Sequence, residues 1–347
     1  MTAVRDVALA GALLACACAG PERGTLSPRL AFRIVGDSTL RAPRDLTVDS
    51  AGNVFIFDYD DYEIRRFDSA GTPLATFGGT GPEPGRFQHL MAIRADGDSL
   101  LALDAGSISV FGLSGDLRSR RALADTVTCD LPRVRPDGRW VSDCIVEASA
   151  ERTLSLRAAD GSEERRPASY ALSEVFPGVE RGRDFFVNPT QARAYLYDFT
   201  PDGRLVWAVS DRLRVLVDRA GVDETLFEGE ATAQPFPAEQ RAALEERRAR
   251  VPPPFFMNVP DDYQLIQHLV VAASGEVWLY VTSRERTGLL RLSPEGRETG
   301  FYTVEAEFDL LSARLTEAGG RLYFLVPGRE ETAVYKVELP SAEARGR

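Results

Sequence analysis

The sequence has few of the residues on which many enzymes and nucleic-acid-binding proteins depend. Its 347 residues include 2 histidines, 4 cysteines, three asparagines and one lysine, Lys336. A single lysine argues against Schiff-base or P-loop chemistry, and two histidines cannot supply a three-histidine zinc site. The formal net charge of −11 argues against binding to a phosphate backbone. The motifs Gly-x-Ser-x-Gly, His-Glu-x-x-His and Cys-x-x-Cys are absent.

The sequence also lacks an apolar run of the roughly 20 residues needed to span a bilayer. Its N-terminus has a shorter run, Val7–Ala15, which follows Arg5 and is typical of a secretory signal. The end of this run, Leu13-Leu14-Ala15-Cys16, resembles the bacterial lipobox. The resemblance implies a signal peptide over residues 1–15, a lipid on Cys16, and a tether over residues 16–29. It also implies export and anchoring in the bacterial envelope, at the outer membrane or in the periplasm; an ordinary cleaved signal is the alternative.

Glycine turns followed by apolar strands recur along the rest of the chain. Each of six copies has a turn that ends in glycine, an apolar strand, a gap and a second strand. The turn glycines are Gly52, Gly97, Gly138, Gly203, Gly275 and Gly320. Three of the five spacings are 41 or 45 residues, the length of one four-stranded propeller blade. The two longer spacings, 65 and 72 residues, predict insertions at about 162–199 and 229–262.

The chemistry of each copy predicts the fold. Asp-Gly and Ser-x-Gly supply the positive φ that a tight hairpin needs. The following strand is apolar at almost every position, which indicates that both of its faces are covered. One blade cannot bury its own faces, so the copies must stack in a closed ring. We therefore predict an all-β protein, a six-bladed β-propeller over residues 30–340 with a polar tail over 341–347.

Two further elements follow from the pattern. The sixth copy lacks an outer strand, and Leu30–Val35 is strand-like without a blade of its own. We expect this N-terminal strand to pair with the sixth blade and close the ring, which removes two exposed edges. Residues Pro237–Arg250 predict one short inserted helix, with Glu246 and Arg250 spaced for an ion pair. Pro252–Pro254 then prevents the helix from continuing.

The first copy resembles an NHL repeat. The matching residues lie between Thr47 and Ile93 and include Asp49, Gly52, Asn53, Val54, Phe55, Phe57, Asp58, Ile64–Asp68, Gly71, Phe77, Gly78, Gly81 and Gly85–Phe87. Over residues 30–340 the chain resembles bacterial lipoproteins that are six-bladed β-propellers of the TolB-like superfamily. The resemblance implies the fold but not the activity, because propellers host both binding and catalysis.

Some polar residues are candidates for special roles. Cys129 and Cys144 flank the turn of the third blade and are expected to form a disulfide in an oxidising compartment. Such a bond would contribute roughly 3 kcal/mol; two buried thiols are the alternative. Both histidines precede inner strands, which approach the central channel of a propeller. The residues that could line the channel are His89, His268, Asn188 and Asn258.

Four aspartates recur near the end of the apolar strand: Asp58, Asp104, Asp143 and Asp211. The NHL pattern has an aspartate there, where its oxygens can accept hydrogen bonds from turn N–H groups. This interpretation is favoured over a metal site. The tryptophans Trp140, Trp207 and Trp278 lie within the apolar strands and are expected to pack between blades.

These observations favour a binding or scaffolding propeller at the envelope, without a catalytic site or a metal site. Its expected partner is a protein or a small ligand on a propeller face, and its contact with the membrane is through the lipid alone. Nucleic acid is not expected as a partner. One alternative is a lactonase-type or lyase-type enzyme with a divalent metal in the central channel. Another is a receptor for a carbohydrate or other small ligand.

Overall fold

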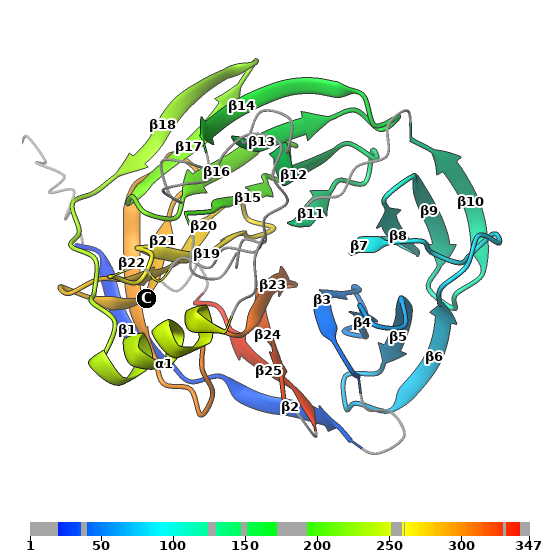
Figure 1. Ribbon diagram of the computed structural model, residues 1–347, viewed down its shortest axis with the longest axis horizontal. Coiled ribbons are helices and arrows are strands. Elements are labelled where there is room, and N and C mark those ends of the chain that lie inside the picture. Colours follow the sequence, from blue (N-terminus) through cyan, green and yellow to red (C-terminus); the bar gives the residue numbers. More distant parts are fainter. Residues whose placement is uncertain are drawn as a thin grey trace, which may run out of the picture.

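The strands form six sheets arranged around a central axis (Figure 1). The computed structural model describes residues 20–35, 40–123, 130–146, 151–171, 193–250, 259, 261–328 and 331–340. In each sheet the consecutive strands are antiparallel, and the first strand of the blade lies nearest the axis. The predicted six-bladed all-β propeller is confirmed.

The blades follow one another in chain order. Blade 1 comprises β3 (Pro43–Val48), β4 (Val54–Asp58), β5 (Glu63–Phe67) and β6 (Pro73–Gly78). Blade 2 comprises β7 (Leu90–Asp96), β8 (Ser99–Asp104), β9 (Ser107–Gly112) and β10 (Leu117–Ala122). Blade 3 comprises β11 (Asp130–Val134), β12 (Trp140–Val146), β13 (Glu151–Arg157) and β14 (Glu163–Ala171).

The second half of the ring has the same plan. Blade 4 comprises β15 (Tyr195–Phe199), β16 (Leu205–Val209), β17 (Arg214–Arg219) and β18 (Val222–Glu228). Blade 5 comprises β19 (Ile266–Val271), β20 (Val277–Thr282), β21 (Thr287–Leu292) and β22 (Glu298–Val304). Blade 6 comprises β23 (Arg314–Ala318), β24 (Arg321–Pro327) and β25 (Thr332–Glu338).

The chain closes the ring as the sequence predicts. Strand β2 (Arg29–Ile34) pairs antiparallel with β25 and becomes the outer strand of blade 6. Its Phe32 is buried and reaches the first blade, where its ring centroid lies 5.8 Å from that of Phe67. The N-terminal strand therefore joins the last blade to the first.

A second N-terminal strand was not predicted. Residues Glu22–Leu26, expected as part of a tether, form β1, which pairs in parallel with β22 at the outer edge of blade 5. Leu26 is buried, and its carbonyl accepts a hydrogen bond of 2.9 Å from the N–H of Glu305. The segment is mostly polar because one side of an outer strand faces solvent, so its pattern resembles that of a linker.

Both insertions differ in extent from the prediction. The range 162–199 includes β14 and β15, which belong to blades 3 and 4. Strand β14 is largely polar because it lies at the outer edge of its blade, so its sequence resembles that of an inserted loop. The second insertion holds α1 (Ala238–Ala249), the predicted helix, which buries none of its residues and carries the Glu246–Arg250 pair.

The hydrophobic core lies between the blades. Six clusters of buried side chains are found in the described residues, and each joins two neighbouring sheets. Strands β4 and β20 are buried at every position, in agreement with their continuous apolar sequences. Stacking of the sheets thus covers both faces of these second strands.

Among the described residues, no helix combines the length and the apolar character required to cross a lipid bilayer.

Candidate functional site

The first strands of all six blades line a cavity at one end of the propeller axis. This turn-side cavity has a volume of about 740 Å³ and lies where the first strands end and turn into the second strands. A smaller cavity of about 190 Å³, here called the upstream cavity, lies where several first strands begin. Arg133, Val270 and Leu315 line both cavities. The axis is therefore the place where all blades contribute to one polar, concave surface.

One position of the repeat places a side chain at the turn-side cavity in every blade. In each blade this residue lies on the first strand and pairs with the second buried residue of the second strand. In blade 1, for example, Thr47 on β3 pairs with Phe55 on β4. The six equivalent residues, here called the channel ring, are Thr47, Arg94, Arg133, Asp198, Val270 and Thr316. The ring holds two cations from neighbouring blades and one carboxylate.

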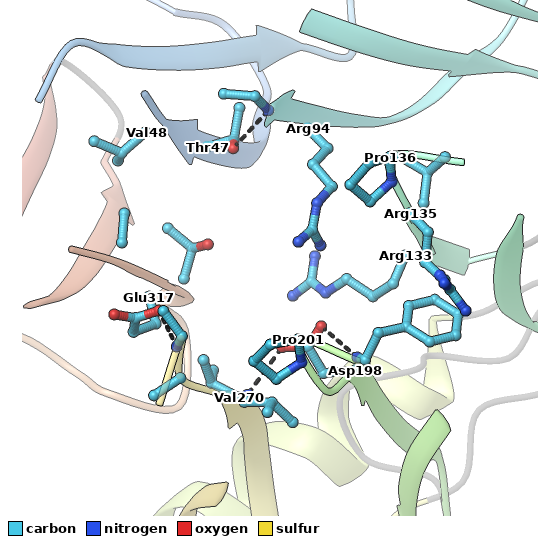
Figure 2. A pocket seen from close by; sticks show the side chains of 18 of the residues that line it. Thr47, Val48, Arg94, Arg133, Arg135, Pro136, Asp198, Pro201, Val270 and Glu317 are labelled. Carbon is cyan, nitrogen blue, oxygen red and sulfur yellow. Dashed lines mark hydrogen bonds between the residues drawn. The ribbon is translucent and has the colours of Figure 1, made fainter. Parts of the chain in front are cut away.

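The two arginines of the channel ring converge. Figure 2 shows the guanidinium groups of Arg94 and Arg133 pointing toward one another inside the cavity. Nη1 of Arg133 lies 3.5 Å from Oδ1 of Asp45. Burial opposes the charge of Arg133, but the nearby carboxylates of Asp45 and Asp198 raise its pKa overall. Arg94 is partly buried, and its side chain makes no hydrogen bond or ion pair with the described part of the chain.

The carboxylates of the turn-side cavity bind backbone amides. Asp198 accepts hydrogen bonds of 2.9 Å from the N–H groups of Phe199 and Val271. Glu317 accepts from Ala273 at 3.1 Å and from Gly320 at 2.8 Å, and burial raises its pKa. Both side chains thereby fasten their own blade to blade 5 (Figure 2).

The upstream cavity contains His268, one of the residues predicted to line the channel. Its Nε2 lies 3.0 Å from the carbonyl oxygen of Leu310, and burial lowers its pKa to about 4. His268 is therefore neutral near pH 7. The same cavity touches a buried ion pair in which Nε of Arg152 lies 2.7 Å from Oδ1 of Asp143.

The other predicted channel residues have different outcomes. His89 lies just before β7, with Nδ1 3.1 Å from the hydroxyl of Tyr62, and it lines neither cavity formed by the described residues. Asn188 and Asn258 lie outside the described residues. Cys16 and Cys129 also lie outside them. Cys144 is buried and disulfide-bonded, but its pairing with Cys129 stays a prediction.

The recurring aspartates mostly bind backbone amides, as expected. Asp58 accepts hydrogen bonds from the N–H groups of Arg41 at 2.5 Å and Ala42 at 3.0 Å, just before β3. Asp104 accepts one of 2.6 Å from the N–H of His89, just before β7. Asp211 differs, because it pairs with the side chain of Arg193 at 2.6 Å. Within the described ranges, no group of three or more His, Cys, Asp or Glu side chains is placed to hold a metal ion.

The three tryptophans are part of the core between blades. Trp140 and Trp278 are fully buried, and Trp207 is nearly so. Nε1 of Trp207 donates a hydrogen bond of 3.0 Å to Asp223. None of the three presents an exposed ring face on which a sugar could stack.

Sequence reasoning missed Arg94 and Arg133, although a signal for them exists. Each lies in the short strand before a turn glycine, in the segments Ile93-Arg94-Ala95 and Pro132-Arg133-Val134. First strands lie nearest the axis, and successive side chains of a strand point to opposite faces, so an arginine between two apolar residues of a first strand is a candidate for the side that reaches the axis. The position of each residue of the channel ring follows from its pairing across the hairpin that joins the first strand to the second.

Comparisons with known proteins bear on the fold. No family model matches the chain, and no curated protein matches it in sequence. A candidate exported protein from Bacteroides fragilis NCTC 9343 is similar in structure, with a TM-score of 0.55 and 9% identity over 92% of this chain and 99% of that one. A member of the DUF4221 family from Bacteroides vulgatus ATCC 8482 has a TM-score of 0.55 and 9% identity, over 92% of this chain and 100% of that one.

A luciferin-regenerating enzyme is also similar, with a TM-score of 0.50 and 12% identity over 86% of this chain and 92% of that one. At these identities the likeness concerns the backbone fold alone, because side chains at the axis differ freely between propellers. The chain therefore shares its backbone fold with these three proteins.

Proposed function

We propose that the chain is an exported binding protein that takes a small molecule into the turn-side cavity. The observation that carries this proposal is the channel ring, where two guanidinium groups converge in a cavity of about 740 Å³. Small-molecule sites in proteins are concave, have volumes of about 300–1,000 Å³ and contain few convergent polar groups. The cavity has these properties, and it is built from the ends of rigid strands.

The proposal includes a location in the bacterial envelope. Its support is the apolar run before Cys16, the resemblance of that run to a lipobox, and the structural likeness to a candidate exported protein. A Cys16→Ala variant tests the anchor. We expect the parent chain to incorporate labelled palmitate and to fractionate with membranes, and the variant to do neither. Equal labelling of both proteins would contradict an anchor at Cys16.

A metal-dependent enzyme of the lactonase or lyase type is the rival function. Such a site would need several carboxylate or amide oxygens converging at the axis. The carboxylates of Asp198 and Glu317 are instead directed at backbone amides of blade 5. We therefore favour binding, and we treat turnover of a lactone as an outcome that would contradict it.

The test uses a substitution that fills the cavity and should therefore exclude ligands of any charge. Thr316 belongs to the channel ring, so a Thr316→Trp substitution should fill the turn-side cavity. Thr76→Trp, on the exposed outer strand β6, is the matched control. The purified full chain is screened by thermal shift against sugars, organic acids and lipids, because a ligand that binds the folded state raises Tm.

We expect at least one compound to raise Tm of the parent and the Thr76→Trp protein and to leave Tm of the Thr316→Trp protein unchanged. Metal analysis of the same preparations accompanies the screen. Ligands that stabilise the Thr316→Trp protein equally would place the site elsewhere. A stoichiometric divalent metal together with hydrolysis of a lactone would replace binding by catalysis.

A further inference from the structure

We infer that the ligand of the turn-side cavity is a small organic anion whose carboxylate or phosphate group is held between Arg94 and Arg133. This inference rests on the proposed binding function and adds the chemical class of the ligand. It depends on three features of the cavity: an unpaired cation, carboxylates that are already occupied, and space beside the two guanidinium groups.

Arg94 is the unpaired cation. Other arginines at the same cavity have acceptors: Arg135 donates to the carbonyl of Gly203 at 2.5 Å and pairs with Asp137 at 3.0 Å. Arg94 has no such partner among the described residues, although its guanidinium points into a partly enclosed space. Two converging cations repel each other, and the repulsion is stronger where water is scarce. An anion between Arg94 and Arg133 would remove this repulsion.

Among the described residues, the carboxylates Asp198 and Glu317 of this cavity already have hydrogen-bond partners. Asp198 and Glu317 are each fixed by two backbone N–H groups, which hold them against blade 5. Asp45 approaches Arg133 from the upstream cavity. In the part of the chain that the structure describes, the Arg133 side chain has no other hydrogen bond or ion pair, so the side of its guanidinium that faces Arg94 is open to a ligand (Figure 2).

Guanidinium groups select the chemistry of the ligand. Their planar pair of N–H donors matches the spacing of two oxygens in a carboxylate or a phosphate, and such bidentate contacts are strong. The cavity is larger than the anionic group alone requires, and its wall includes Val48, Phe199 and Leu315. The remainder of the ligand would lie against this wall, which favours an organic anion over inorganic phosphate.

Arg94→Gln is the informative variant because it should fold normally. Arg94 contributes no hydrogen bond or ion pair that the described structure would lose, and its removal relieves repulsion with Arg133. We expect its Tm to equal or exceed that of the parent, as is common where a site conflicts with stability. Arg118→Gln is the matched control, since Arg118 lies on the exposed strand β10 of the same blade.

The experiment compares three probes that share a sugar ring. Glucuronate carries a carboxylate, glucose 6-phosphate carries a phosphate, and glucose is neutral. Each is titrated to about 10 mM into the full chain, and binding is measured by thermal shift and calorimetry. We expect at least one of the two anions to bind and glucose not to bind. The anion that binds better identifies which acidic group the site prefers.

The same anion should bind the Arg94→Gln protein at least about tenfold more weakly, and the Arg118→Gln protein as the parent does. Added NaCl should weaken binding to the parent, because salt screens the attraction. The inference is overturned if neither anion binds, if glucose binds as tightly, or if Arg94→Gln has no effect.

The Thr316→Trp protein separates this inference from the proposed function. If that substitution abolishes binding of a probe and Arg94→Gln does not, the cavity is a binding site but its ligand is not selected by the arginines. If probes bind the Thr316→Trp protein normally, the cavity is not the site, and both proposals fail.

Discussion

Arg133 and Asp45 form an ion pair between blades that are not neighbours in the ring. Nη1 of Arg133 on β11 lies 3.5 Å from Oδ1 of Asp45 on β3, and blade 2 separates the two strands along the chain. Burial raises the pKa of Asp45 even though Arg133 is present. Near the central axis, charged groups therefore meet that belong to blades which do not pack against each other. Burial there limits their contact with water.

The first prediction concerns this pair. An Arg133→Gln substitution removes the cation that pairs with buried Asp45, and only the more weakly acting Arg314 still attracts that carboxylate among the causes that shift its pKa. We therefore expect a loss of about 2 kcal/mol in the free energy of unfolding near pH 7. The pKa of Asp45 is already raised, and the substitution should raise it further. Because a protonated Asp45 needs no cation, the loss should shrink as the pH falls below this raised pKa. Urea unfolding at several pH values measures it.

The control for this prediction is the double variant Arg133→Gln with Asp45→Asn. It should regain most of the lost stability near pH 7, because residue 45 no longer carries a buried charge that needs Arg133. A loss that is independent of pH and is not regained by the double variant would show that Arg133 acts through packing.

The second prediction concerns His268, whose pKa burial lowers to about 4. Between about pH 6.5 and pH 4 the unfolded chain binds a proton at this residue and the folded protein does not. Stability should therefore fall as the pH decreases through this window, by up to about 3 kcal/mol from this group. His268→Gln removes the titrating group and retains a donor for the carbonyl of Leu310.

Urea unfolding of the parent and the His268→Gln protein at matched pH values measures the difference. The two stability curves should converge or cross toward pH 4. Curves that stay parallel from pH 7 to pH 4 would mean that His268 is not held neutral by its surroundings.

The third prediction tests β1, the strand that adds to blade 5. Leu26 is 7% exposed, so Leu26→Ala should lower the free energy of unfolding by about 2 kcal/mol. Leu74 lies on the outer strand β6 and is 49% exposed, and Leu74→Ala should change stability by less than about 0.5 kcal/mol. Equal effects in chemical denaturation would indicate that β1 does not pack stably on β22.

The fourth prediction tests the closure of the ring at Gly71. This glycine has φ +90°, and a Cβ atom there would lie 2.5 Å from Cβ of Phe32 on β2. Gly97 also has positive φ, +56°, but a Cβ atom there would meet no atom within 4 Å. We expect Gly97→Ala to cost about 1 kcal/mol, through backbone strain alone.

Gly71→Ala should cost clearly more, about 3 kcal/mol, because backbone strain and overpacking against the closing strand add together. Thermal unfolding of both variants makes the comparison. Similar Tm values for the two proteins would show that β2 can move away from blade 1 at little cost.

Much of the architecture was predictable because it depends on local chemistry. Turn glycines such as Gly138 and Gly203 have positive φ in the structure, and the apolar strands that follow them are the second strands of their blades. The closing role of Leu30–Val35 followed from an incomplete last copy. Strand β1 was not predictable, because its residues are mostly polar and blade 5 already has four strands of its own, so no copy of the repeat was left incomplete for it to fill.

The candidate site was less predictable than the fold. Histidine and asparagine are rare in the chain and therefore drew attention as candidate channel residues, whereas arginine is too common for any one arginine to stand out. His268 does line the upstream cavity, but His89 points instead to Tyr62. Arg94 and Arg133 lie at the centre of the proposed site. Each stands between apolar residues of a first strand, and this pattern also fits a buried strand without any binding role.

The repeating unit follows from the amino-acid sequence alone, because the φ angle of glycine and the burial of an all-apolar strand act within a few residues. So do the number of blades and the strand left over to close them. Which charged side chains meet at the axis depends instead on how the blades pack. Arg94, Arg133 and Asp198 are far apart along the chain, and their distances and hydration depend on how six sheets pack around one line.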